Sequence, residues 1–78
     1  MKELVEFLAQ QLVNNPEAVD VKEAQGETAS VLELRVAKED LGRVIGKQGR
    51  TAKSIRTILN AAASRSNRKV VLEIVEDG

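Results

Sequence analysis

Residues 44–55 have the sequence VIGKQGRTAKSI, in which two glycines, Gly46 and Gly49, flank Lys47 and Gln48. Glycine has no side chain, so the backbone of a partner can come close and the chain can take conformations that other residues avoid. If a helix begins after Gly49, its first N–H groups and its dipole favour an anion at this loop. With basic side chains in and directly after the loop, the segment indicates a site for a phosphodiester.

The same pattern has a plainer interpretation as a connector between two helices. In that interpretation Gly46 is a helix C-cap and Gly49 relieves strain in the turn. An isolated G-x-x-G is short and common, so by itself it favours the connector. The choice between the two interpretations depends on what surrounds the loop.

The residues before the loop predict one helix and one hairpin. Residues 2–14 place several apolar side chains on one helical face, and Asn14-Asn15-Pro16 ends the helix because the residue before a proline is disfavoured in a helix. Residues 18–25 and 30–37 alternate apolar and polar side chains. The short turn between them predicts that these two strands form a hairpin.

Two helices and a strand are expected around and after the loop. Glu39 and Asp40 suit the start of a short helix, because acids are favoured at the positive end of a helix dipole, and Gly46 ends it. A second helix is expected from about Arg50 to Ser66, with Ala52, Ile55, Ile58, Leu59 and Ala62 facing inward and Lys53, Arg56 and Asn60 facing outward. Residues 69–75 predict the last strand. The order α-β-β-α-α-β predicts a two-layer α+β domain, a three-stranded sheet with helices packed on one face.

Charge is distributed unevenly, although the 12 basic and 12 acidic residues cancel. Residues 42–69 contain eight Lys or Arg and no Asp or Glu, so the acids all lie in the flanking segments. A purely cationic block indicates a surface that faces a polyanion. A solvated basic helix face would give the same pattern.

Composition excludes several classes of protein. Without cysteine there is no disulfide scaffold or thiolate metal site, and without histidine the usual general base and the commonest metal ligand are missing. Phe7 is the only aromatic residue, so nucleic-acid binding would not rest on stacked aromatics. The spacing around Gly42 and Lys47 fits neither a P-loop nor a dinucleotide fingerprint. We therefore expect no enzyme, no catalytic residue, no metal and no cofactor.

The chain carries no feature of a membrane or exported protein. No segment approaches the ~20 apolar residues of a membrane span, and residues 1–15 lack the unbroken apolar run of a signal peptide. We expect one domain over residues 1–78, located in the cytoplasm and without membrane contact.

Taken with its surroundings, the loop resembles that of a known family. VIGKQGRTAKSI, placed between two helices with a strand on either side of the pair, resembles the KH domain, whose G-x-x-G loop clamps the backbone of about four nucleotides. The predicted element order is similar to the type II form of that fold. The chain length, LGRVIGKQGRTAKSIR at residues 41–56 and VVLEIVE at residues 70–76 resemble the small bacterial single-domain KH proteins of the KhpA (YlqC) family.

This resemblance implies a set of RNA-binding residues: Arg43, Val44, Ile45, Gly46, Lys47, Gln48, Gly49, Arg50 and Lys53. The loop itself would seat the phosphates, and the four basic residues would neutralise their charge. Val44 and Ile45, extended by Leu34 and Val36, would form an apolar wall for the bases. Ala52 stands where many KH domains carry a larger aliphatic residue, which leaves base preference open.

The resemblance also implies partners. These are single-stranded RNA, a second copy in a homodimer, and a KhpB (EloR/Jag)-like KH protein, in an RNA chaperone or post-transcriptional role linked to cell elongation and division. Ala61 lies off the predicted core stripe and fits either a close helix contact or a plain helix former.

One alternative function is a KH-shaped protein-interaction module whose dimer or hetero-dimer surface is the function. A helix-turn-helix DNA-binding module is a weaker alternative, because the hairpin and last strand have no place in its simplest form.

Overall fold

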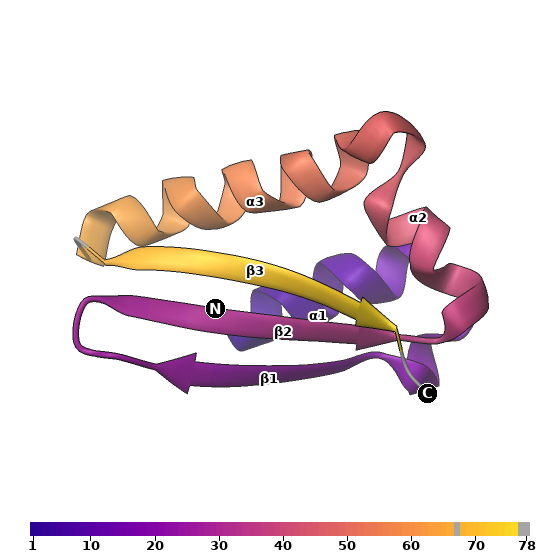
Figure 1. Ribbon diagram of the computed structural model, residues 1–78, viewed down its shortest axis with the longest axis horizontal. Helices are drawn as coiled ribbons and strands as arrows, with labels where there is room; N and C mark the ends of the chain where they lie inside the picture. The colour runs from indigo at the N-terminus through magenta and orange to yellow at the C-terminus, as the bar shows by residue number, and fades with distance from the viewer. Residues whose placement is uncertain (67, 77–78) are drawn as a thin grey trace.

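The computed structural model describes residues 1–66 and 68–76, and these form three helices and three strands (Figure 1). In chain order they are α1 (Lys2–Leu12), β1 (Asp20–Gln25), β2 (Ala29–Val36), α2 (Leu41–Ile45), α3 (Arg50–Ala63) and β3 (Lys69–Glu76). Single 3-10 turns lie at Pro16–Ala18, Lys38–Asp40, Lys47–Gly49 and Ser64–Ser66. The predicted α-β-β-α-α-β order is confirmed. Among these described residues, no helix has the length and apolarity needed to cross a membrane.

The first helix is shorter than predicted. It ends at Leu12, and Val13 is already extended, with φ −96° and ψ 158°. The helix therefore ends two residues before the end at residue 14 that Asn14-Asn15-Pro16 predicted. Because Pro16–Ala18 forms a tight turn, β1 begins at Asp20 rather than at residue 18.

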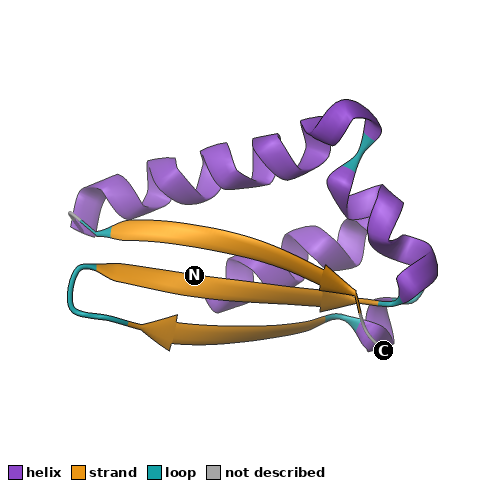
Figure 2. Ribbon diagram, viewed as in Figure 1, coloured by secondary structure: helices purple, strands orange, loops and turns teal. Residues whose placement is uncertain are grey.

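The sheet has the strand order β1-β2-β3 and combines an antiparallel with a parallel pair (Figure 2). The predicted hairpin is confirmed, since β1 runs antiparallel to β2 with Val21 opposite Leu34. On the other side β3 runs parallel to β2, with Leu34 opposite Ile74. Parallel neighbours need a long crossover connection. In this chain α2 and α3 form the crossover, and the G-x-x-G loop lies at its turning point.

All three helices pack on one face of the sheet. In β2 every second residue is buried, and Leu32, Leu34 and Val36 are each 0% exposed. The helix residues in the same core cluster are Val5 and Ala9 of α1, Val44 of α2, and Ile55 and Leu59 of α3. In Figure 1, α3 runs along β3 and α1 lies behind β2. The predicted two-layer α+β architecture is confirmed. Burial of these apolar side chains between the two layers is the main driving force for folding.

The core-facing stripe of α3 differs from the predicted one. Its buried residues are Ala52, Ile55, Leu59 and Ala63. Ile58 is 44% exposed and Ala62 is also exposed, so their predicted inward positions are wrong. In a helix with 3.6 residues per turn, a stripe that passes through residues 55 and 59 reaches residue 63 next. Residues 58 and 62 therefore lie on one flank of the stripe. The predicted outer positions are exposed at Lys53, Arg56 and Asn60.

Candidate nucleic-acid interface

The G-x-x-G loop is a tight turn between α2 and α3. Gly46 leaves α2 with φ 78° and ψ 169°, a combination that is essentially restricted to glycine. Gln48 and Gly49 then take left-handed conformations, with φ 58° and 74°. The N–H of Gly49 donates to the carbonyl of Gly46 at 3.1 Å, and α3 begins at the next residue. These backbone angles hold Lys47 and Gln48 out in solvent, where both are exposed.

The two glycines of the loop have different surroundings. Gly46 lies against Thr51, in the first turn of α3, so closely that a Cβ atom would collide with it. A Cβ atom on Gly49 would have no neighbour within 4 Å. Gly46 is therefore required by both its backbone conformation and its packing, whereas Gly49 is favoured by its conformation alone and faces open space.

Basic side chains surround the loop. Lys47, Arg50 and Lys53 are exposed, and the side chain of Arg43 is 54% exposed. Within the described residues, the only hydrogen-bond partner of the Arg50 side chain is Gln48. The Oε1 atom of Gln48 accepts from Nη2 of Arg50 at 3.4 Å. In the same part of the chain no carboxylate pairs with Lys47, Arg50 or Lys53. The three charges therefore remain available to an anion.

The start of α3 contributes a second electrostatic feature. The helix runs for 14 residues, its first turn contains no acidic residue, and no side chain caps its N-terminus. The positive end of its dipole therefore lies at the loop. A helix N-terminus beside exposed cations is a favourable place for a phosphate group. The phosphodiester interpretation of the loop is thus compatible with its geometry.

The expected apolar wall is much smaller than the sequence suggested. Ile45 is 36% exposed beside the loop, as expected. Val44, Leu34 and Val36 are each 0% exposed and belong to the core, so the expectation that they line the surface is wrong. Val44 and Ile45 point about 100° apart on α2, so that one faces the core and the other solvent, whereas Leu34 and Val36 lie on the face of β2 that the helices cover. Of the four residues expected to form the wall, Ile45 is the one that is exposed to solvent in the described structure.

The two exposed flanks of α3 differ in character. One flank, which we call the polar flank, carries Lys53, Arg56 and Asn60; the other, the apolar flank, carries Ile58, Ala61 and Ala62. On the polar flank, Nη2 of Arg56 donates to the carbonyl of Leu72 in β3 at 3.4 Å. Ala61 is exposed, so its predicted position off the core stripe is confirmed.

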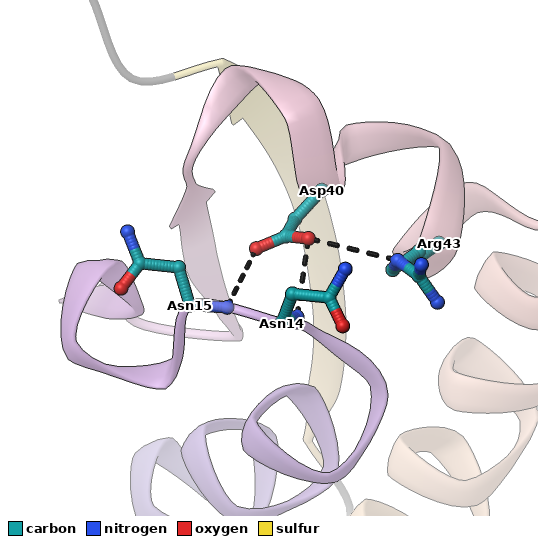
Figure 3. Close-up of polar contacts among 4 residues, drawn as sticks. All are labelled: Asn14, Asn15, Asp40 and Arg43. Atoms are coloured by element: carbon teal, nitrogen blue, oxygen red, sulfur yellow. Dashed lines mark hydrogen bonds and ion pairs between the residues drawn. The ribbon is translucent and has the colours of Figure 1, made fainter.

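Sequence reasoning missed the role of Asp40 next to this site. Asp40 precedes α2, as predicted for a helix-start acid, but its side chain does not cap that helix. The carboxylate is completely buried and accepts hydrogen bonds from the backbone N–H groups of Asn14 and Asn15 (Figure 3). Backbone donors more than 20 residues away leave no pattern in a sequence, so no signal could have identified this contact.

Comparison with known proteins agrees with the fold. A family described as "KhpA/KhpB, KH domain" matches residues 2–74. The "RNA-binding protein KhpA" of Clostridium perfringens is 59% identical over 75 residues, covering 96% of this chain and 100% of the relative. The proteins of the same name from Clostridium acetobutylicum and Chlamydia caviae are 55% identical over 75 residues and 52% identical over 77 residues. They cover 96% and 99% of this chain, and 100% and 99% of their own lengths.

No solved structure matches the chain with significance. The family match covers nearly all of the described elements, from the start of α1 into β3. The curated relatives extend over nearly their full lengths and far exceed the identity at which a family can be assigned. Both results agree with the α+β fold described above. This chain therefore belongs to the KhpA/KhpB family of KH domains.

Proposed function

We propose that this chain is a non-catalytic RNA-binding protein that clamps the backbone of single-stranded RNA with Gly46–Gly49. The observation that carries the proposal is the loop itself: a four-residue turn at the uncapped N-terminus of α3, beside three exposed basic side chains that pair with no carboxylate among the described residues, namely Lys47, Arg50 and Lys53. The curated relatives are named RNA-binding proteins, which supports RNA as the polyanion. A phosphodiester needs close backbone approach and positive charge, and this loop offers both.

In this proposal the roles divide between backbone, charge and apolar contact. Gly46–Gly49 seats one or more phosphates, and Arg43, Lys47, Arg50 and Lys53 neutralise them. Gln48 is the exposed tip of the clamp, and Ile45 supplies the apolar contact for a base. Val44 contributes indirectly, since its burial holds α2 against the sheet. Because the described face offers no aromatic platform, base selectivity would be weak and phosphate contacts would dominate affinity.

The experiment is a titration of a fluorescent single-stranded RNA with the protein at several salt concentrations. If the four basic residues each meet a phosphate, the logarithm of affinity falls against the logarithm of salt concentration with a slope of about −3, at roughly −0.7 for each neutralised phosphate. The matched duplex RNA is expected to bind more weakly, because a paired strand cannot lie in a short loop clamp. Binding that is absent, or that does not depend on salt, would contradict the proposal.

We also propose that the apolar flank of α3 forms a homodimer contact. Ile58 is 44% exposed there, beside the small side chains of Ala61 and Ala62. Small residues let two helices approach closely, and an exposed isoleucine provides apolar area to bury. The apolar flank points away from the polar flank that carries Lys53, so both loops of a dimer remain open to RNA. Two linked sites raise the effective affinity of a weak clamp.

A KhpB (EloR/Jag)-like KH protein is the proposed alternative occupant of the same flank. The proposed cellular role, an RNA chaperone or post-transcriptional regulator in the cytoplasm linked to cell elongation and division, rests on the family resemblance. The competing function is a protein-interaction module in which this flank is the active surface and RNA binding is incidental. The two functions differ in one respect: only the clamp requires the loop charges and the open face of Gly49 together.

A further inference from the structure

The carboxylate of Asp40 makes three contacts that join two distant parts of the chain. One oxygen, Oδ1, accepts from the N–H of Asn14 at 3.1 Å, and the other, Oδ2, accepts from the N–H of Asn15 at 3.0 Å. Nε of Arg43 lies 3.7 Å from Oδ1 and forms an ion pair with it. Figure 3 shows Asp40 at the centre of these contacts. Asp40 is 0% exposed, so its charge is compensated inside the protein and not by water.

These contacts tie the end of α1 to the start of α2. α1 ends at Leu12, so the N–H groups of Asn14 and Asn15 lie beyond the helix and need other acceptors. Asp40 supplies one oxygen to each donor from a position directly before α2. The link therefore holds two elements together that are separated by the whole β1–β2 hairpin.

The position of the loop depends on this link. α2 has only five residues, Leu41–Ile45, and so short a helix is not stable by itself. Its placement comes from tertiary contacts, which are the burial of Val44 in the core and the link through Asp40 at its start. The chain passes from α2 directly into Gly46. Whatever holds the start of α2 therefore also sets where the clamp lies.

The same carboxylate lies against one side of the Arg43 guanidinium. The ion pair uses Nε, and Figure 3 shows the two terminal nitrogens of Arg43 on the side away from Asp40. The side chain is 54% exposed, so this outward side is open to solvent. A guanidinium presents its donors in a planar fork that matches the oxygens of a phosphate. We infer that Asp40 is a positioning residue, which orients the free fork of Arg43 toward a phosphodiester of RNA bound at the loop.

This inference rests on the proposed RNA clamp and adds a specific dependence to it. If Asp40 only neutralised Arg43, removal of the carboxylate charge would strengthen RNA binding. If Asp40 only stabilised the fold, its loss would weaken binding independently of Arg43. If it also orients Arg43, the part of the Asp40 effect that acts through Arg43 disappears once Arg43 is absent, and the two losses no longer multiply.

The experiment is a double-variant cycle on the full chain, with fluorescence anisotropy of a single-stranded RNA oligonucleotide as the readout. Asp40→Asn keeps the side-chain shape and removes the charge. We expect Asp40→Asn and Arg43→Ala each to lower affinity by roughly three- to tenfold, and the double variant to lose clearly less than the product of the two single losses, with the residual loss coming from the link that holds α2. In the matched control, the losses of Asp40→Asn and Lys53→Ala multiply, because Lys53 has no contact with Asp40 in the described structure.

A further variant separates orientation from folding. Arg43→Lys leaves Asp40 and its two backbone contacts in place, but the three donors of an ammonium sit on one nitrogen and cannot present a planar pair to a phosphate while Asp40 holds the other side. We expect Arg43→Lys to lose nearly as much affinity as Arg43→Ala. Hydrogen exchange at the amides of Asn14 and Asn15, measured without RNA, should stay as slow as in the parent for Arg43→Lys and become faster for Asp40→Asn.

The outcomes distinguish this inference from the proposed function. Failure of the parent protein to bind RNA would overturn both. Salt-dependent RNA binding by the parent, with losses for Asp40→Asn and Arg43→Ala that multiply, would overturn the role of Asp40 and leave the clamp intact. Tighter binding by Asp40→Asn, or binding by Arg43→Lys equal to that of the parent, would likewise overturn the role of Asp40 alone.

Discussion

Gly46 and Thr51 approach each other so closely that only glycine fits at the first position. A Cβ atom on Gly46 would lie 2.2 Å from Oγ1 of Thr51, 2.7 Å from its Cβ and 2.8 Å from its backbone nitrogen. Because one of these atoms belongs to the backbone, rotation of the threonine side chain would not remove the overlap. This contact packs the end of α2 onto the first turn of α3, so Gly46 sets the angle at which the two helices meet.

The first prediction compares alanine at the two glycines. Gly46→Ala is expected to lower the free energy of unfolding by at least about 2 kcal/mol, because a strained backbone conformation and an overlap with Thr51 act together. Gly49→Ala should cost only about 1 kcal/mol, since it has left-handed strain without overlap. Urea unfolding followed by circular dichroism measures both. Equal losses at the two positions would show that the contact with Thr51 is unimportant.

The second prediction concerns strain at Gln48, a residue other than glycine that has a φ of 58° and a ψ of 25°. Gln48→Gly should leave the free energy of unfolding unchanged or raise it by up to about 1 kcal/mol, because glycine adopts this conformation without steric cost. The control is Ser54→Gly at an exposed position within α3, where glycine should cost roughly 1 kcal/mol. A similar loss in both variants would contradict the left-handed conformation of Gln48.

The sequence was sufficient to predict features that depend on local patterns. The loop follows from two glycines at a fixed spacing between two helical stretches, and the hairpin from alternation on either side of a short turn. These features are encoded within about ten neighbouring residues, and each was found in the structure at nearly the predicted place. The placement of helices on one face followed because every element had a single apolar stripe to bury.

The errors in α2 and α3 concern which apolar residue is buried. Val44 and Ile45 are adjacent and both strongly apolar, yet Val44 is 0% exposed and Ile45 is 36% exposed. In α3 the stripe passes through Leu59 and leaves Ile58 on the flank. An apolar side chain looks the same in a sequence whether it is buried or exposed. In a helix, its angular position around the helix axis, which we call its phase, decides between the two. The phase is set by packing against β3, which the sequence of the helix alone does not contain.

The contacts of Asp40 are a structural feature that a single sequence does not encode. The carboxylate binds backbone N–H groups, and every residue except proline carries such a donor. Nothing in the Asn14-Asn15 pair identifies these two donors as the ones that face Asp40. The contact exists only after the β1–β2 hairpin has brought the start of α2 beside the end of α1.

The third prediction tests whether the polar flank of α3 meets RNA. Lys53→Ala should reduce the steepness of the salt dependence of RNA affinity by about 0.7, the amount for one phosphate contact on a single strand. Lys22→Ala removes the same charge from an exposed position in β1, at the opposite edge of the sheet from β3, and should leave the slope nearly unchanged. The measurement is a fluorescence titration at four or more salt concentrations. Equal changes in the two variants would mean that net charge, and not position, governs binding.

The fourth prediction concerns the apolar flank of α3. Ala61→Asp should convert a dimer into monomers, because it places like charges together at a two-fold contact. Asn60→Asp introduces the same charge on the polar flank and should leave the dimer intact. Sedimentation equilibrium at micromolar concentration provides the masses. A parent protein that is already monomeric, or an Ala61→Asp variant that still dimerises, would contradict a dimer through this flank.

The central claim, that the loop clamps an RNA backbone, is tested most directly by two substitutions at Gly49. Asn and Asp have the same shape and both tolerate the left-handed conformation found there, and a Cβ atom at this position meets no neighbour within 4 Å. We therefore expect both variants to fold like the parent in a thermal melt, which makes the comparison one of charge alone. In a titration with single-stranded RNA, Gly49→Asn should retain most of the affinity, whereas Gly49→Asp should lose at least about tenfold, because its carboxylate occupies the place of a phosphate. Equal RNA affinity in the two folded variants would contradict the clamp.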